Sequence, residues 1–419
     1  MFWYSSYPRT ENKRTFTRQF AGFGVGEDFS GAVKEMTTAG GLYLRRLVAA
    51  NVLDAFILGA YTLTIPLLLV ERNIDVATIG IVFSAFPIVF VVSRMLFASA
   101  ADSVGLRKFF NLNALGNLAS GILYAISSSP FSYAVAKAAQ GIKESSLWAV
   151  NRNAAYEITS NENPAMVTST IIFVRSLAIA VGAVVSGFLI FWAGFESVFV
   201  LLAVVSALIF IPARSLDIGI RKKRLTLNGL FEKLDPRLVD RRIWRTSLVM
   251  SSYVAASTLA VGFVLPIFLK SRGLGYWEIG MIIAAYTGVG ALLLPMTLRR
   301  TPSVKNTILV QALLYVPAVV LIPVSGGWFM VCMVLIMAFG ESTSYIVWES
   351  LITQSIKDTE NVATSIGFVH VPSNLVLIPS FLIAGYLIEK FGYVAPFWIA
   401  GVLFLLFSIT AWRTLKPQE

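Results

Sequence analysis

Long apolar stretches separated by short polar loops run through most of the chain. A helix that spans a bilayer needs about 20 consecutive, mostly apolar residues. Twelve stretches reach that length, at 46–70, 77–99, 109–128, 131–156, 166–193, 196–213, 244–269, 277–298, 304–324, 328–355, 362–388 and 393–412. A β-barrel shows short segments of alternating polarity instead. The pattern therefore predicts an all-α polytopic membrane protein with twelve transmembrane helices.

The second half of this pattern repeats the first at an offset of about 200 residues. Residues 65–80 read IPLLLVERNIDVATIG and residues 265–280 read LPIFLKSRGLGYWEIG. Further on, KESS at 143–146 matches GEST at 340–343. Internal repeats in a membrane protein are typical of transporters in which one half rocks against the other around a central site. We therefore expect two six-helix bundles built on one plan.

Polar segments set the expected domain boundaries. The longest one inside the chain coincides with the boundary between the repeats and carries the charge run Arg221–Arg224. The predicted order is a cytoplasmic N-terminal tail (1–45), an N-terminal bundle (46–213), a basic cytoplasmic linker (214–245), a C-terminal bundle (246–412) and a cytoplasmic C-terminal tail (413–419). Residues 1–40 contain no apolar segment followed by a cleavage site, so no removable signal peptide is expected.

Composition agrees with a membrane protein, since 56% of the residues are hydrophobic and only 14% are charged. The net charge of +11 follows the positive-inside rule, because most Lys and Arg lie in the tails and in alternate loops. We therefore expect a multi-pass protein of the cell membrane, with both termini in the cytoplasm and no nucleic-acid partner. The absence of a GxxxxGK[ST] sequence argues against an ATP-driven pump within the chain. No cofactor or metal is expected.

Ionisable side chains inside membrane spans are costly and are functional candidates by default. They are Asp54, Arg94, Lys137, Lys143, Glu144, Arg152, Arg175, Glu341, Glu349 and His370. Helix rise places Asp54, Glu144, Arg175, Glu341 and His370 in one layer near the midplane. Secondary transporters bind substrate and coupling ions at that depth.

Helical spacing groups some of these residues on shared faces, together with amides and aromatic rings. The faces are Lys137, Glu144 and Trp148; Glu341, Tyr345 and Trp348; and Asn51, Asp54 and Tyr61. Such faces suit a wet cavity that takes an organic molecule. Lys143 lies about 100° from Glu144 around the helix, so the two side chains are expected to point apart.

Each assignment has a structural alternative. Glu144 and Glu341 can be ions paired within each bundle, and His370 can be a hydrogen-bonded packing residue. Trp148 and Trp348 can pack inside a bundle rather than contact substrate. Arg94 and Arg152 lie toward the cytoplasmic ends and fit a gate or a snorkelling position.

Two short motifs resemble those of a known family. The segment 98–108, ASAADSVGLRK, is similar to the G-x-x-x-D-R-x-G-R-R loop of the major facilitator superfamily, with Asp102, Gly105, Arg107 and Lys108 at matching positions. KAAQG at 137–141 resembles that family's R-x-x-Q-G motif. The resemblance implies that spans 1, 4, 7 and 10 line a central cavity and that spans 2, 5, 8 and 11 form the moving interface. It also implies that Asp102 helps to hold the cytoplasmic side shut.

The sequence thus predicts a secondary active transporter that moves a small organic solute by alternating access, with protons as the coupling ion and a monomer as the working unit. Asp54, Glu144 and Glu341 are the expected coupling groups. The expected substrate contacts are Asn51, Lys137, Lys143, Trp148, Arg175, Trp348 and His370, and the expected gate is Arg94, Asp102, Arg107 and Lys108. Efflux of amphipathic compounds and uniport remain open. A lipid-modifying enzyme or a scaffold fits less well, because the outer loops are short.

Overall fold

The computed structural model describes residues 39–158, 164–216, 240–299, 303–356 and 362–415, and the elements within them are helices. The first half contains α3 (Ala39–Glu71), α4 (Val76–Val104), α5 (Leu106–Ile126), α6 (Pro130–Ile158) and α7 (Pro164–Ala213). The second half contains α9 (Arg241–Ala260), α10 (Val264–Ser271), α11 (Tyr276–Arg299), α12 (Val304–Leu321), the 3-10 turn η2 (Ile322–Val324), α13 (Gly327–Ile356), α14 (Val362–Leu375), α15 (Leu377–Phe391) and α16 (Val394–Thr414). The expected all-α class is confirmed for the described residues.

Several helices are long and apolar enough to cross a membrane. In the described ranges, nine helical segments meet that criterion by length and hydropathy. One of them, Thr170–Ala213 in α7, has 44 residues. At about 1.5 Å per residue it is roughly twice as long as the hydrocarbon core is thick. Its backbone bends at Gly194, where φ is 77°, a value that glycine adopts without steric cost.

The second half contains interruptions that the apolar pattern does not reveal. The stretch 244–269, expected to be one helix, consists of α9 and α10 with a break at residues 261–263. The stretch 362–388 consists of α14 and α15, which are separated at Val376. In the first half α3 continues over 33 residues, with Pro66 inside it. The two halves therefore share a plan but differ in helix continuity.

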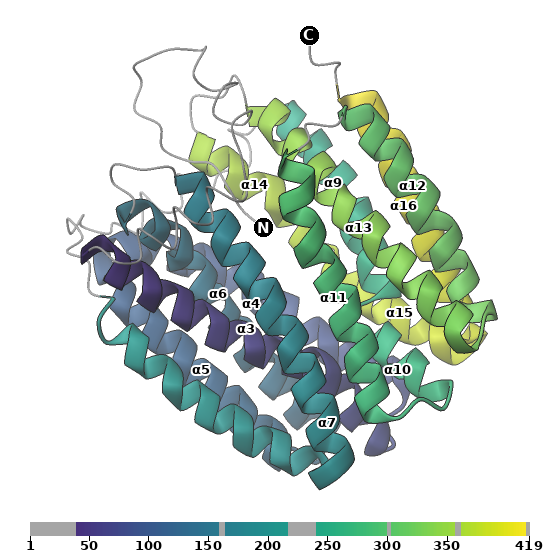
Figure 1. Cartoon of the computed structure of the whole chain (residues 1–419), viewed down its shortest axis with the longest axis horizontal. Coiled ribbons are helices and arrows are strands. Elements are labelled where there is room, and N and C mark those ends of the chain that lie inside the picture. Colours follow the sequence, from purple (N-terminus) through teal and green to yellow (C-terminus); the bar gives the residue numbers. More distant parts are fainter. Residues whose placement is uncertain (1–38, 159–163, 217–239, 300–302, 357–361, 416–419) are drawn as a thin grey trace.

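Each half packs mainly within itself, and two helix pairs provide most of the contact between the halves. Figure 1 shows the first half (purple to teal) beside the second half (green to yellow). Between the halves, α4 packs against α15 and α7 packs against α11. These helices correspond to the expected spans 2, 11, 5 and 8, so the prediction of which helices meet is confirmed.

Two pairs of glycines allow the halves to approach closely, and we call Gly80, Gly187, Gly280 and Gly385 the glycine seam. A Cβ built on Gly80 would lie 3.3 Å from the Cα of Gly385, and one built on Gly280 would lie 3.2 Å from the Cα of Gly187. Both pairs lie near the helix ends that adjoin the loops around residues 72–75 and 272–275. At the same end, the Tyr276 hydroxyl donates a hydrogen bond to Glu71 Oε2 at 2.7 Å. The halves are therefore in contact at this end of the molecule.

The predicted domain limits differ slightly from the helix limits. α3 begins at Ala39, so residues 39–45 of the expected tail are helical. α9 begins at Arg241, where the Asp240 side chain caps the helix by accepting a hydrogen bond from the Arg242 N–H. Residues 1–38, 217–239 and 416–419, which include most of the expected linker, lie outside the described residues.

Candidate functional site

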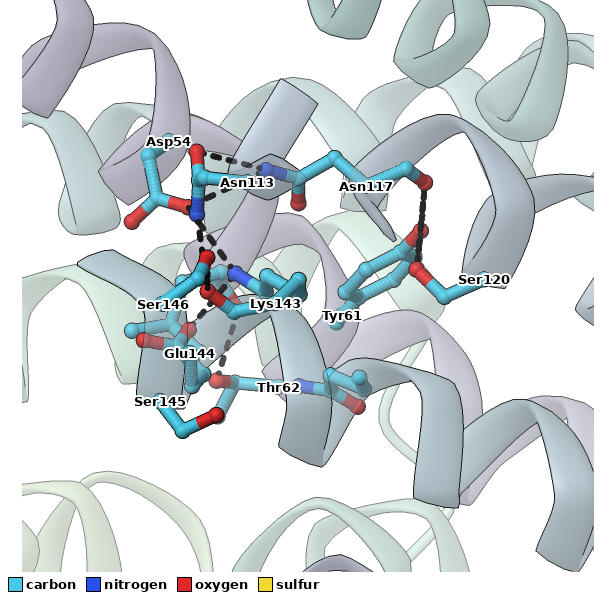
Figure 2. Close-up of polar contacts among 12 residues, drawn as sticks. Asp54, Tyr61, Thr62, Asn113, Asn117, Ser120, Lys143, Glu144, Ser145 and Ser146 are labelled. Carbon is cyan, nitrogen blue, oxygen red and sulfur yellow. Dashed lines mark hydrogen bonds and ion pairs between the residues drawn. The ribbon is translucent and has the colours of Figure 1, made fainter. Parts of the chain in front are cut away.

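Asp54 lies at the centre of a polar cluster inside the first half (Figure 2). Its Oδ1 accepts hydrogen bonds from Lys143 Nζ at 3.0 Å, Asn113 Nδ2 at 3.0 Å and Asn117 Nδ2 at 3.1 Å. Its Oδ2 accepts one from Arg175 at 3.0 Å. The side chain is 0% exposed. Asp54 thus joins α3 to α5, α6 and α7 through both of its oxygens.

Lys143 connects Asp54 to a second carboxylate. Its Nζ lies 3.0 Å from Asp54 Oδ1 and 2.6 Å from Glu144 Oε1. The expectation that Lys143 and Glu144 point apart is therefore wrong. The Lys143 side chain has four methylene groups, which let the ammonium reach around the helix. A buried ammonium gains most by lying between two carboxylates, because water is excluded there.

Arg175 and a pair of amides extend the cluster along α3. Arg175 donates to Asn51 Oδ1 at 3.0 Å as well as to Asp54. Asn51 and Asn151 exchange two side-chain hydrogen bonds at 2.7 and 2.6 Å, which join α3 to α6. The guanidinium carbon of Arg175 lies 5.8 Å from the centre of the Trp148 ring, within the range of a cation–π contact.

The four charges of this cluster cancel. Asp54 and Glu144 are balanced by Lys143 and Arg175, and all four residues are at least nine-tenths buried. Removing one member of a buried ion pair typically costs about 3–5 kcal/mol, because the partner charge is left uncompensated. The arrangement can therefore hold four helices together in a fixed geometry.

Lys137 lies apart from this cluster, near the junction of the halves. Its Nζ donates to Gln140 Oε1 at 3.0 Å and lies 4.1 Å from the centre of the Phe83 ring. The Phe83 ring packs against Phe263 and Phe381 of the second half, with ring centres 5.1 and 5.7 Å away. Lys137 is 6% exposed. The ring that covers this ammonium thus packs in turn on two rings of the second half.

Glu341 on α13 is surrounded by hydroxyl groups from two other helices. Its Oε1 accepts hydrogen bonds from Ser257 at 2.6 Å and from Tyr253 at 3.4 Å, both on α9. Its Oε2 accepts one from Tyr286 on α11. Among the described residues, no basic nitrogen lies within ion-pairing distance of this carboxylate. Glu341 is half-buried, and in the described part of the structure no cation balances the charge of its carboxylate.

Trp348 and His370 continue this region away from Glu341. The Trp348 ring lies 5.6 Å from the Tyr253 ring and 5.6 Å from the His370 ring, measured between ring centres. Both Trp348 and His370 are buried. His370 therefore packs against an aromatic ring in the second half, whereas Asp54 and Arg175 contact each other in the first half. The structure brings Asp54, Glu144 and Arg175 into one cluster and places Glu341 and His370 in another region.

The expected gate residues lie at the opposite end of α4 from Gly80. Arg94 is half-buried, with its guanidinium carbon 5.7 Å from the centre of the Phe90 ring. Arg107 and Lys108 are exposed in the first turn of α5. The side chains of Asp102 and Arg152 lie outside the described part of the structure. A gate formed by Asp102, Arg107, Lys108 and Arg94 stays a prediction.

Sequence reasoning missed several residues that hold these groups in place. They are Asn113, Asn117 and Asn151 in the first half, and Tyr253, Ser257 and Tyr286 in the second. The spacing of Asn113 and Asn117, four residues apart in an apolar helix, was a usable signal, because it puts two amides on one face. In the described residues, no three His, Cys, Asp or Glu side chains come together in a metal-binding arrangement.

In each half a glycine allows two helices to pack closely, but the glycine lies on a different helix of the pair in the two halves. In the first half, a Cβ built on Gly116 of α5 would lie 2.6 Å from the Lys143 Cβ of α6. In the second half the small residue is on the other helix, since a Cβ on Gly340 of α13 would lie 3.0 Å from the Tyr315 Cβ of α12. Lys143 and Gly340 are equivalent in the repeat. The buried cation therefore exists in one half only.

The comparisons with known proteins concern the family and the fold. The sequence profile of the Major Facilitator Superfamily matches residues 47–359. A variant of the nucleoside transporter NupG has a similar structure, with a TM-score of 0.72 and 13% sequence identity over 89% of this chain and 100% of that chain. The human organic anion transporter MFSD10 (TETRAN) gives a TM-score of 0.64 and 17% identity over 90% of this chain and 100% of that chain. At these identities the likeness shows the fold alone. No curated protein matched this chain by sequence.

Proposed function

The chain belongs to the major facilitator superfamily, and from this premise we propose that it is a secondary transporter that moves a small organic solute by alternating access, with protons as the coupling ion. The single observation that carries the coupling is the position of Glu341. It is a half-buried carboxylate with hydroxyl donors and, among the described residues, no basic partner. Membrane transporters of this family bind their solutes between the two halves, and Glu341 lies on α13, one of the helices expected to line that space.

We propose further that the chain crosses the membrane twelve times, as six helices in each half, with both termini in the cytoplasm. The nine segments of sufficient hydropathy in the described ranges support this proposal. α6 and α11, with 29 and 24 residues, are long enough to add two crossings. The bend at Gly194 would divide α7 into two crossings. The excess of Lys and Arg in the tails and alternate loops supports the orientation in the cell membrane.

In this mechanism the two groups of acidic residues have different tasks. Asp54 and Glu144 hold the first half together as part of a neutral cluster, and each carboxylate already has a cationic partner. A proton that binds there must first displace a buried cation, which is costly. Glu341 can gain or lose a proton without displacing one. We therefore move the coupling role from the set Asp54, Glu144 and Glu341 to Glu341.

A proton on Glu341 changes the interactions between three helices. The ionised carboxylate accepts from hydroxyls on α9 and α11 and so draws both helices toward α13. Protonation weakens these charge-assisted hydrogen bonds, and α11 is one of the helices that touch the first half. The titratable groups around Glu341 are Tyr253 (α9), Tyr286 (α11), Tyr315 (α12) and, on α13, Tyr345 and Glu349; His370 (α14) faces Trp348.

The test measures whether pH moves the halves through Glu341. Spin labels at Glu196 and Lys390, which are exposed in different halves, report the opening of the end that carries the glycine seam. The background carries Cys332→Ser, and the purified full chain is placed in lipid nanodiscs between about pH 5 and pH 8. We expect electron–electron distances that shift with pH, no shift in Glu341→Gln, and a retained shift in the repeat-equivalent control Glu144→Gln. A shift that survives Glu341→Gln contradicts the coupling role of Glu341. No shift at all contradicts proton coupling and favours a uniporter.

A further inference from the structure

We propose that the transported solute is an organic cation whose positive centre binds the Glu341 carboxylate among the aromatic rings of the second half. The inference deepens the proposed function, since it names the chemical class of the solute at the same site. Three observations support it: the balance of charges in the two halves, the residues around Glu341, and the greater exposure of Glu341 than of Lys137.

The balance of charges leaves few groups that can attract a charged solute. In the first half, Asp54, Glu144, Lys143 and Arg175 satisfy one another and are buried. A solute would have to break these pairs in order to use them. Glu341 is different, because its hydrogen bonds come from neutral hydroxyls only. The net charge available at Glu341 is therefore negative, and it attracts a cation.

The residues around Glu341 are those that favour an organic cation over a metal ion. Tyr253 and Tyr286 reach the carboxylate with their hydroxyl groups, and their rings lie on two different helices. Tyr345 follows one turn after Glu341 on α13, and the Trp348 ring packs on Tyr253. Aromatic faces attract alkylated ammonium groups, whereas small hard metal ions bind oxygen ligands and do not need aromatic rings. A metal site would call for converging acidic or imidazole ligands, and the described residues contain no such group.

Lys137 supports the opposite reading, in which the solute is an anion. Its ammonium has an amide oxygen and the Phe83 ring as partners, and no described carboxylate lies within ion-pairing distance of it. However, it is 6% exposed, and the Phe83 ring that covers it packs against Phe263 and Phe381 of the second half. Glu341 is the more accessible of the two charges. We therefore favour the cation and treat the anion as an outcome of the test.

Tetraphenylphosphonium and tetraphenylborate provide a matched test, because they have the same shape and opposite charge. Equilibrium dialysis with the purified full chain in detergent measures their affinities, and tetramethylammonium and tetraethylammonium extend the cation series to smaller sizes. We expect at least one of these cations to bind more tightly than tetraphenylborate. Glu341→Gln should weaken that binding about 10- to 150-fold, the usual range for losing a charged partner. Glu389→Gln, at an exposed position of α15, should leave it unchanged.

A second pair of variants protects the test against misfolding of Glu341→Gln. Tyr286→Phe keeps the ring and loses the hydroxyl, so cation binding should persist. Tyr286→Leu loses the ring and should weaken binding about 2- to 30-fold relative to Tyr286→Phe. The proposal is overturned if no cation of the series binds more tightly than tetraphenylborate, or if the cation binding is unchanged in Glu341→Gln. Tetraphenylborate binding that is lost in Lys137→Gln would establish the anion instead.

The two proposals fail separately. If the labels at Glu196 and Lys390 respond to pH through Glu341 but no cation of the series binds, the solute class is wrong and the coupling stands. If cations bind through Glu341 and the labels do not respond to pH, the cation site stands and proton coupling is wrong.

Discussion

Gly280→Ala should open the end of the molecule where the two halves touch. A Cβ at this position would lie 2.7 Å from the backbone oxygen of Ala183 and 3.2 Å from the Cα of Gly187, both on α7 of the other half. These are backbone atoms, so no side chain can turn away to make room. The clash exists only while α7 and α11 are together, and it disappears when the halves separate.

The size of the effect follows from the cost of overpacking. An extra methyl group in a tightly packed contact costs about 1–3 kcal/mol. A destabilisation of that size in one of two states shifts their ratio about 5- to 150-fold. Replacing glycine by alanine inside a helix also adds up to about 1 kcal/mol of helix propensity in both states, so this gain does not change the ratio.

Gly288→Ala is the matched control, because it makes the same change two turns further along α11. A Cβ there has no neighbour within 4 Å. The assay is the distance between spin labels at Glu196 and Lys390, in the Cys332→Ser background at one fixed pH. We expect a new, longer distance in Gly280→Ala and the original distribution in Gly288→Ala.

Identical distance distributions for Gly280→Ala and Gly288→Ala would refute the reasoning, provided that both proteins unfold at similar temperatures. That result would mean that the α7–α11 contact adapts to a methyl group within the closed state. Gly80→Ala tests the other pair of the seam, since its Cβ would lie 2.5 Å from the Phe381 backbone oxygen.

Two further predictions concern stability. Asp54→Asn leaves Lys143 and Arg175 with one carboxylate between them and should lower the free energy of unfolding by about 3–5 kcal/mol. Glu341→Gln leaves no described cation without its partner and should lower the melting temperature less than Asp54→Asn does. Equal losses in the two variants would contradict the separate tasks of the two carboxylates. Asp75 caps α4 by accepting a hydrogen bond from the Thr78 N–H at 2.7 Å, which lowers the pKa of Asp75. Asp75→Ala should therefore cost about 0.5–2 kcal/mol at neutral pH. The lowered pKa makes this contribution complete above the unfolded value of about 3.9, and the contribution declines as the pH falls toward the folded value. Thermal unfolding of both proteins at about pH 3 and pH 7 checks it, and a difference of the same size at both pH values would exclude the ionised cap as its cause.

The fold was readable from the sequence because membrane helices have a strong and local signal. Apolar stretches of sufficient length predicted the helices, and the repeat of 65–80 at 265–280 predicted related halves. The breaks at 261–263 and Val376 were not predicted. Both are flanked by apolar residues, so hydropathy continues through them while the backbone does not.

The contacts within the site could be predicted from the sequence only in part, because the polar side chains bond to residues on other helices. Asp54 and Arg175 were correctly recognised as candidates, but their contact depends on how α3 packs against α7. The neutral amides of Asn113 and Asn117 carried no charge signal, although they complete the coordination of Asp54. The helix angle between Lys143 and Glu144 wrongly predicted that their side chains point apart. The Lys143 side chain is long enough for its ammonium to reach Glu144 around the helix.

The break at 261–263 packs against α15, and this affects how a second conformation should be compared with this one. The ring of Phe263, the last residue of this break, stacks with the Phe381 ring of α15, and the ring centres are 6.1 Å apart. α3 has no such interruption, and the buried ion pairs lie in its half. When each half is superposed separately, the first half is thus expected to fit closely, whereas the second half should leave a residual displacement in α10 and α15. The second half would then change its curvature during the transport cycle as well as its orientation.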